Sequence, residues 1–97
     1  MLKRSIFQNP EAVERGLELP NVISFRFVGP SDHKYYSKLL GAIESAVQRA
    51  QIKRQVERAS RTGRYISYQF DIFCTDMQEV ESIYRAVGKL TDTKFVL

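Results

Sequence analysis

The sequence predicts an α+β fold of the ferredoxin-like type, a βαββαβ sandwich with a four-stranded antiparallel sheet and two helices on one face. Two observations predict it. Runs of alternating apolar residues, typical of half-buried strands, and runs with apolar residues three and four apart, typical of amphipathic helices, follow one another in that order. The longest alternating run, residues 65–74, has one apolar and one mixed face and therefore suits a central strand. The right-handed crossover of strand–helix–strand units then leaves few topologies.

The chain begins with residues 1–19, which we expect to form a peripheral extension of a single ferredoxin-like domain at residues 20–97. Asn9, Pro10 and Gly16 suit the cap, the first position and the end of a short helix over residues 10–16. Such a helix is too short to be stable without docking on the domain.

The first strand is expected over residues 21–28, with Ile23, Phe25 and Phe27 on one face. Gly29-Pro30-Ser31-Asp32 ends the strand, and Ser31 or Asp32 can cap the helix that follows. An apolar stripe runs along that helix: Tyr36, Leu39, Leu40, Ile43, Val47 and Ala50. Gly41, inside the helix, should lower its stability by about 1 kcal/mol relative to alanine unless close packing compensates.

The second strand is expected over residues 52–60, at an edge of the sheet because Val56 is its only central apolar residue. Gly63 should form the hairpin turn, and Gly63→Val should destabilise the hairpin if the turn needs a positive φ. In the third strand, alternate residues form the core face: Ile66, Tyr68, Phe70, Ile72 and Cys74.

The second helix is expected to begin with a capping box, with Thr75 as the cap and Gln78 as its reciprocal partner. Gly88 stands where a left-handed helix terminator is expected. The apolar residues of this helix are Met77, Val80, Ile83, Tyr84 and Val87. The last strand is expected over residues 91–97, at the other edge of the sheet, with Phe95 and Leu97 on one face.

The composition is that of a soluble globular domain of 97 residues, with 43% hydrophobic and 27% charged residues. A single cysteine, Cys74, excludes a disulfide within the chain. No apolar run approaches the ~20 residues of a membrane helix, and no apolar stretch follows the first basic residues as in a secretory signal. We therefore expect a cytoplasmic protein that does not bind membranes.

The net charge of +4 is concentrated in residues 49–64, which carry six basic residues against Glu57 alone. Such a segment attracts anions or an acidic partner. The alternative is a solvated edge strand and turn, kept soluble by their lysines and arginines. The candidate residues for binding an anion or a partner are Arg54, Arg58, Arg61, Arg64 and Tyr65.

No group of residues has the pattern of a catalytic or metal site. His33 is the only histidine and has no second histidine or cysteine nearby. Cys74 lies on the core face of its strand, which favours an inert thiol. Gly29 lacks the glycine pattern of a phosphate loop. The loop after the first strand also lacks the arginine that acylphosphatases use there. We therefore expect no catalytic residues, no bound metal, no cofactor and no enzyme activity.

Two motifs carry a resemblance to a known family: Ser60-x-x-Gly63-x-Tyr65-x-Ser67 at the hairpin, and Val80-Glu81-x-x-Tyr84-x-x-x-Gly88-Lys89 on the second helix. Gly29 and the closing Val96-Leu97 add to it. Over residues 21–97 the chain resembles the YbeD-like family of small bacterial proteins, whose function is unknown. The resemblance implies a ferredoxin-like fold similar to the ACT regulatory domains that bind small ligands. The N-terminal extension and the strongly basic residues 49–58 depart from the family's usual form.

The outward residues of the sheet form a polar face with aromatic anchors: Ser24, Arg26, Tyr65, Ser67, Gln69 and Phe73. This composition suits a protein interface or a self-association surface, so a homodimer is compatible with it. These observations favour a small regulatory module that acts by binding a protein partner or a small ligand. In the ACT-like version, Gly29, Ser31 and Asp32 would form a ligand loop, where the N–H groups at the helix start face an anion. The alternative at Gly29 is a plain turn.

The alternative function is weak, non-specific binding of RNA or another nucleic acid through the basic residues 49–64. An RRM stacks bases on two outward aromatic residues of the same strand. Here Tyr65 is followed two positions later by Ser67, so only contact with the phosphate backbone is expected.

Overall fold

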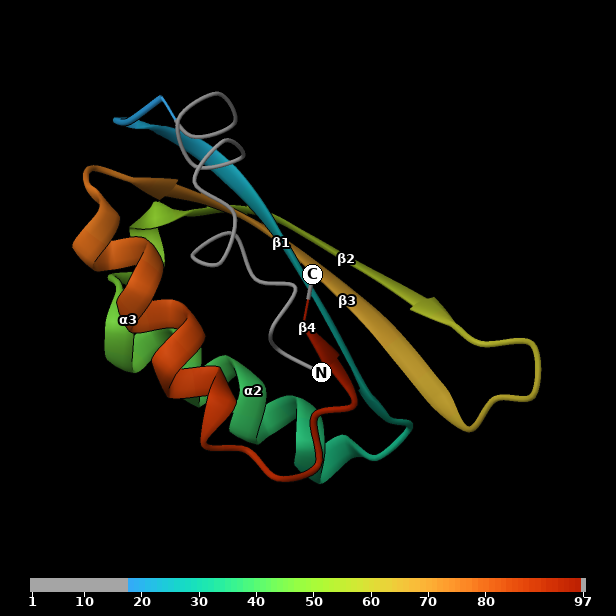
Figure 1. Ribbon diagram of the computed structural model, residues 1–97. Helices are drawn as coiled ribbons and strands as arrows, with labels where there is room; N and C mark the ends of the chain where they lie inside the picture. Colours follow the sequence, from blue (N-terminus) through green and yellow to red (C-terminus); the bar gives the residue numbers. More distant parts are fainter. Residues whose placement is uncertain (1–17, 97) are drawn as a thin grey trace.

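The computed structural model describes residues 18–96, and its elements alternate in a way that is consistent with the predicted βαββαβ order (Figure 1). The elements are β1 (Asn21–Pro30), α2 (His33–Ala46), the 3-10 turn η3 (Arg49–Gln51), β2 (Ile52–Ala59), β3 (Tyr65–Cys74), α3 (Met77–Gly88) and β4 (Phe95–Val96). The chain is therefore of the α+β class. Most of the predicted N-terminal extension, with its helix over residues 10–16, lies outside the described residues.

Three long strands build an antiparallel sheet, and β4 extends it at one edge, in the order β2-β3-β1-β4. β1 and β3 pair along all ten residues, from Asn21 opposite Cys74 to Pro30 opposite Tyr65. β2 lies at the other edge, as its polar sequence predicts. The predicted last strand over residues 91–97 begins too early, because β4 starts at Phe95 and runs to Val96, while Leu97 lies outside the described residues. The residues before it form a turn in which the Thr93 amide donates to the Leu90 carbonyl.

The core lies between one face of the sheet and the two helices, which cover that face together (Figure 1). The core face predicted for β3 is confirmed, because Tyr68, Phe70, Ile72 and Cys74 are all buried and Ile66 packs half-buried against them. The remaining buried apolar residues come from β1, from α2 with its C-cap Val47, and from α3: Phe25, Phe27, Tyr35, Leu39, Ile43, Val47, Val80, Ile83 and Val87. No helix covers the opposite face of the sheet in the described part of the chain.

The stripe predicted for the first helix is confirmed at Leu39, Ile43 and Val47, which are buried, while Tyr36 and Leu40 are half-buried against the core. It differs from the structure at its two ends. Tyr35, not Tyr36, is the first buried residue, and it packs against Gly29 of β1, where the absent side chain leaves room for an aromatic ring. The helix ends at Ala46, since its C-cap Val47 has extended backbone. Ala50 consequently lies in η3 and is exposed. Asp32 is the N-cap, as one of the two predicted alternatives stated.

The capping box predicted for the second helix is not the cap that the structure has. Asp76, not Thr75, is the N-cap, and its carboxylate accepts from the Glu79 amide at 3.1 Å. The Glu79 carboxylate accepts from the amide of Thr75, the residue before the cap, at 2.8 Å, and Gln78 takes no part. Gly88 is also not a left-handed terminator: it belongs to the helix, and the C-cap Lys89 has a φ of −78°.

Gly63 has a φ of +76°, as the hairpin prediction required. Valine is strained in this conformation, so Gly63→Val should lower the free energy of unfolding by about 1–2 kcal/mol. Gly63→Asn is the matched control, because asparagine tolerates left-handed backbone and should cost less. Urea denaturation of the two variants checks the prediction, which fails if valine is tolerated as well as asparagine.

Gly41 lies on the exposed side of α2, and an added Cβ would meet no atom within 4 Å. No close packing compensates for the glycine, so Gly41→Ala should raise the free energy of unfolding by about 1 kcal/mol through its higher helix propensity. Thermal denaturation measures the effect. A lower melting temperature for the alanine variant would show that Gly41 has a role that its surroundings do not reveal.

Candidate functional site

The candidate site lies on the sheet face that the helices leave open. Because side chains alternate along a strand, the residues on this face are those of opposite parity to the core. The strand register aligns them in three cross-strand rows: Ser24–Asp71–Arg54, Arg26–Gln69–Val56 and Val28–Ser67–Arg58. We call the surface formed by these rows the open face. It carries three arginines from two strands that are not neighbours in the sheet.

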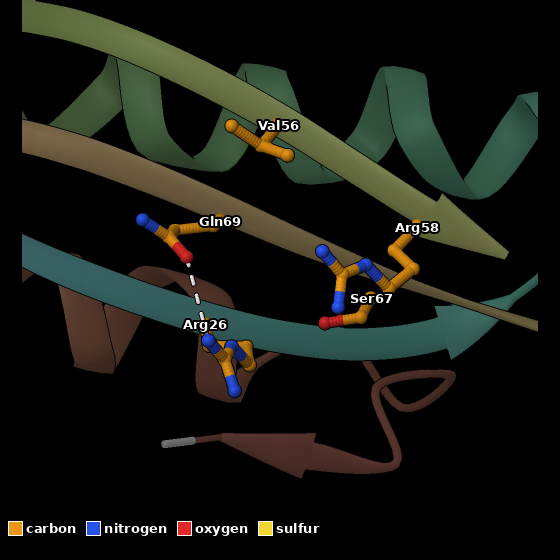
Figure 2. A pocket seen from close by; sticks show the side chains of 5 residues that line it. All are labelled: Arg26, Val56, Arg58, Ser67 and Gln69. Atoms are coloured by element: carbon orange, nitrogen blue, oxygen red, sulfur yellow. Dashed lines mark hydrogen bonds between the residues drawn. The ribbon is translucent and has the colours of Figure 1, made fainter. Parts of the chain in front are cut away.

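A shallow hollow of about 120 Å³ lies between the second and third rows of the open face (Figure 2). It is lined by Arg26, Val56, Arg58, Ser67 and Gln69. Arg26 donates from Nη2 to Gln69 Oε1 at 3.4 Å, a long bond that leaves most of the guanidinium free for other acceptors. In Figure 2 the Arg58 side chain reaches from β2 towards Ser67. The hollow therefore presents two guanidinium groups, a hydroxyl and an amide.

The three rows of the open face contain one acidic residue, Asp71, and its carboxylate already has hydrogen-bond partners. It accepts from the Ser24 hydroxyl at 2.7 Å and from the Gln69 amide at 3.1 Å. Within residues 18–96, ion pairs join Lys38 to Asp92, Arg49 to Glu44, and Arg85 to Glu81. The open-face arginines take part in none of these pairs. Their charges are therefore available to an anion from outside the described chain.

The structure separates the predicted anion-binding residues into two groups. Arg54 and Arg58 lie on the open face, and Tyr65 begins β3 on the same face, with 38% of its surface exposed. Arg61 and Arg64 lie in the exposed loop of the hairpin, which extends past the helices (Figure 1). The Arg64 carbonyl accepts from the Ser31 amide at 2.9 Å, so this loop is held against the end of β1.

Arg26 was predicted to lie on the exposed sheet face, but it was not among the residues predicted to bind an anion. Its position on the open-face side of β1 follows from the alternation of that strand. Its closeness to Arg58 does not, because the two residues are 32 positions apart in the sequence and meet only through β3. The register of β1 and β2 on β3 is what places both guanidinium groups at one hollow.

At the predicted ligand loop, the N–H groups are already bonded. The Ser31 amide donates to the Arg64 carbonyl, and the Asp32 amide donates to the Pro30 carbonyl at 2.8 Å. The Asp32 carboxylate accepts from the Lys34 amide at 2.9 Å and thereby places a negative group at the helix start. Gly29 is buried under the Tyr35 ring. This geometry opposes the binding of an anion at the loop.

The remaining candidate groups are not arranged for chemistry. Cys74 is fully buried, and burial raises its pKa to about 11, with further contributions from the Glu79 and Asp76 carboxylates. A thiol with this pKa is a poor nucleophile near neutral pH. His33 is exposed at the first position of α2. Within residues 18–96 no three histidine, cysteine or acidic side chains are placed to hold a metal ion.

Neither helix in the described part of the chain is both long and apolar enough to span a bilayer. Among known families, the model described as "Protein of unknown function (DUF493)" matches residues 14–97. No curated protein matches the chain. The matched residues include the open face, the hairpin and both helices, so the candidate site lies within the segment that the family model matches.

Proposed function

This chain belongs to the DUF493 family, whose function is unknown and which the YbeD-like resemblance indicated. We propose that it is a small regulatory module that acts by binding. Its partner is an acidic protein surface, and the contact is made by the open face. The βαββαβ order of elements supports a ferredoxin-like architecture similar to ACT regulatory domains, which are non-catalytic binding modules.

The observation that carries the proposal is the group formed by Arg26, Arg54 and Arg58 on the open face, without ion-pair partners among residues 18–96. Guanidinium groups bind carboxylates through two parallel hydrogen bonds, which gives both orientation and strength. Arginine and tyrosine are also the residues that most often dominate protein interfaces. Val22 and Tyr65, with 44% and 38% of their surfaces exposed, lie towards opposite ends of this face and would supply apolar contacts.

The same proposal includes the absence of catalysis and a cytoplasmic location. The raised pKa of Cys74 and its burial support the first. A single cysteine, which forms no disulfide within the chain, suits the second. A partner that carries carboxylates would be attracted by the basic surface before contact, since complementary charge increases association rates.

Charge reversal tests the proposal. The double variant with Arg26→Glu and Arg58→Glu should bind a fluorescent octaglutamate peptide at least about tenfold more weakly than the wild type, because it removes two guanidinium partners and adds repulsion. Fluorescence anisotropy at fixed ionic strength measures the affinity. The expected difference should shrink as salt is added.

The matched control carries Lys34→Glu and Lys89→Glu, which change the net charge equally but lie on the helix layer. The control should lose no more than about twofold in affinity, since only the long-range field changes. Equal losses in both double variants would show that the peptide responds to net charge alone and would contradict a site on the open face.

Nucleic acid is the second candidate, favoured by one observation: the exposed Tyr65 lies on the open face beside Ser67, which pairs with Arg58. An aromatic ring next to a guanidinium can stack on a base while the cation contacts phosphate. The same assay with mixed single-stranded RNA distinguishes the two. Tighter binding of RNA than of octaglutamate, reduced by Tyr65→Leu, would favour nucleic acid over an acidic protein.

A further inference from the structure

A second hollow, of about 370 Å³, lies on the helix side of the sheet at its β2 edge. The start of α2 lines it with Ser31, Asp32, His33 and Tyr36, and the sheet lines it with Glu57, Ile66 and Tyr68. The sheet residues have the parity of the core, so this hollow and the open face are on opposite sides of the sheet. Its volume is at the small end of ligand pockets, which range from roughly 300 to 1,000 Å³.

One tyrosine side chain in this hollow is nearly buried, and its hydroxyl has no partner in the described chain. Tyr68 is only 3% exposed, and its hydroxyl has no hydrogen bond to any other residue of the described chain. The neighbouring tyrosines differ: Tyr35 bonds to Thr93 at 2.7 Å, and Tyr36 accepts from Gln55 at 2.7 Å. Among residues 18–96 no side-chain polar atom is both fully buried and unpaired, so the Tyr68 hydroxyl retains access to solvent. The hollow that Tyr68 lines is where that access is available.

The charges around the Tyr68 hydroxyl are negative. Burial raises the pKa of Tyr68, and the carboxylates of Glu57 and Asp32 raise it further, which places both within electrostatic reach of the ring. Glu57 stands opposite Tyr68 on β2 and forms no ion pair within the described residues. His33 is the only lining side chain that can carry a positive charge. The Asp32 carboxylate caps the positive end of α2 by accepting from the Lys34 amide, and together with Glu57 it places two negative groups at this hollow, which favours a cation.

An apolar wall accompanies these carboxylates. The rings of Tyr36 and Tyr68 lie 5.5 Å apart between centroids, at 31° to each other, and Ile66 completes the surface. Gln55 fixes the Tyr36 hydroxyl from β2, so the ring is held at the edge of the hollow. Aromatic faces attract organic cations as well as alkyl groups.

We propose that this hollow binds a small organic cation, an ammonium group on a short alkyl chain. The ammonium lies between the carboxylates of Glu57 and Asp32 and donates a hydrogen bond to the Tyr68 hydroxyl oxygen. The alkyl chain packs against Tyr36 and Ile66. This site is independent of the open face: it lies on the other side of the sheet and selects the opposite charge.

To test the site, n-butylammonium is added stepwise to the isotope-labelled protein, and the amide chemical shifts are measured at each step. We expect saturable shifts confined to residues 31–36, 57 and 66–68. The chain has a net charge of +4, so general electrostatics oppose the binding of a cation and cannot mimic this result. The neutral isostere n-butanol should bind at least about tenfold more weakly, because it lacks the charge. Absence of saturable shifts, or equal shifts with n-butanol or butyrate, would overturn the proposal.

Two variants separate binding from folding. Tyr68→Phe removes only the unpaired hydroxyl, and Glu57→Gln removes only the charge. Each variant should lower the affinity for n-butylammonium about tenfold, because one hydrogen bond to a charged group is lost. Tyr68→Phe should not lower the melting temperature, since the hydroxyl bonds to no described residue. Glu81→Gln, an equal change of charge on exposed α3, is the control and should bind as the wild type does. A Tyr68→Phe variant that is less stable but binds normally would show a structural role and contradict the proposal.

The same ammonium chemistry could be presented by a lysine of a protein partner. Binding of a lysine whose two ends are capped as amides distinguishes a protein side chain from a small amine. Its backbone adds bulk next to a hollow whose size suits a small amine. We expect it to bind more weakly than n-butylammonium. Tighter binding of the capped lysine would replace the small molecule with a partner's side chain and overturn that part of the assignment.

Discussion

Replacing Gly29 by alanine is expected to lower the free energy of unfolding by about 3 kcal/mol, near the upper end of typical overpacking costs. Gly29 is buried in β1, and the ring of Tyr35 lies directly on it, so that an added Cβ would overlap three atoms of the ring. The ring cannot move freely, because Tyr35 is 1% exposed and its hydroxyl bonds to Thr93 at 2.7 Å. Either the ring or β1 must shift, and both shifts disturb the core.

A double-mutant cycle identifies the cause of this loss. In a Tyr35→Leu background the aromatic ring is absent, and Gly29→Ala should then cost less than about 1 kcal/mol. Urea denaturation of the wild type, both single variants and the double variant gives the coupling energy. An equal cost of Gly29→Ala in both backgrounds would show that the Tyr35 ring is not the obstacle.

Replacing Glu79 by alanine is expected to lower the free energy of unfolding by about 2 kcal/mol at neutral pH, because several hydrogen bonds to one charged group are lost. The Glu79 carboxylate accepts from the Thr75 amide at 2.8 Å and from the Thr75 hydroxyl at 3.0 Å. It also accepts from the Gln51 side-chain amide at 3.2 Å, which in turn donates to the Phe73 carbonyl. Glu79 thus joins the start of α3, η3 and the end of β3.

The contribution of Glu79 should depend on pH in a defined direction. The Thr75 amide, followed by the hydroxyl of Thr75 and the amide of Gln51, lowers the pKa of Glu79 below its ordinary value of 4.5. A carboxyl whose pKa is lower in the folded state stabilises the fold above its unfolded pKa, and this contribution is lost as the pH falls through the folded value. The difference between wild type and Glu79→Ala should therefore be full at pH 7 and should decrease below about pH 4.5.

Urea denaturation of both proteins at pH 7 and in acid measures this difference. Glu81→Ala is the control on the same helix, where the exposed carboxylate approaches Arg85 only to 4.0 Å. That variant should change stability by no more than about 0.5 kcal/mol at either pH. A Glu79 effect that is unchanged or larger in acid would contradict the assigned pKa direction.

The alternation of apolar residues was enough to predict the central strands. Phe25 and Phe27 in β1 and Phe70 and Ile72 in β3 all lie on the face that the alternation predicted. The position of β2 at an edge followed from its arginines. These features depend on the chain's own periodicity, which the sequence displays directly.

The helix ends were harder to predict because several adjacent residues could cap equally well. Thr75 and Asp76 are both good caps, and the choice between them depends on Glu79, whose carboxylate is also bonded by Gln51 from a distant turn. The burial of Tyr35 at the start of α2 depends in the same way on a tertiary contact, since its ring lies where Gly29 leaves space. No local pattern reports either contact.

Both candidate sites needed the register of the sheet. Arg58 was selected from its charge, but its convergence with Arg26 depends on the pairing of Ser67 with Arg58 and of Gln69 with Arg26. Likewise, the unpaired Tyr68 hydroxyl and Glu57 face each other across β2 and β3 only in the folded chain. Composition identified the basic segment, whereas the fold decides which of its charges act together.

The measurement that tests the central claim most directly is a map of amide chemical shifts as octaglutamate is added to the isotope-labelled protein. Binding through the open face predicts that the largest shifts fall on Arg26, Arg54, Arg58, Ser67 and Gln69, with the helix layer unchanged. Shifts concentrated on α2 and α3, or scattered over all basic residues alike, would contradict the open face as the site where this protein meets an acidic partner.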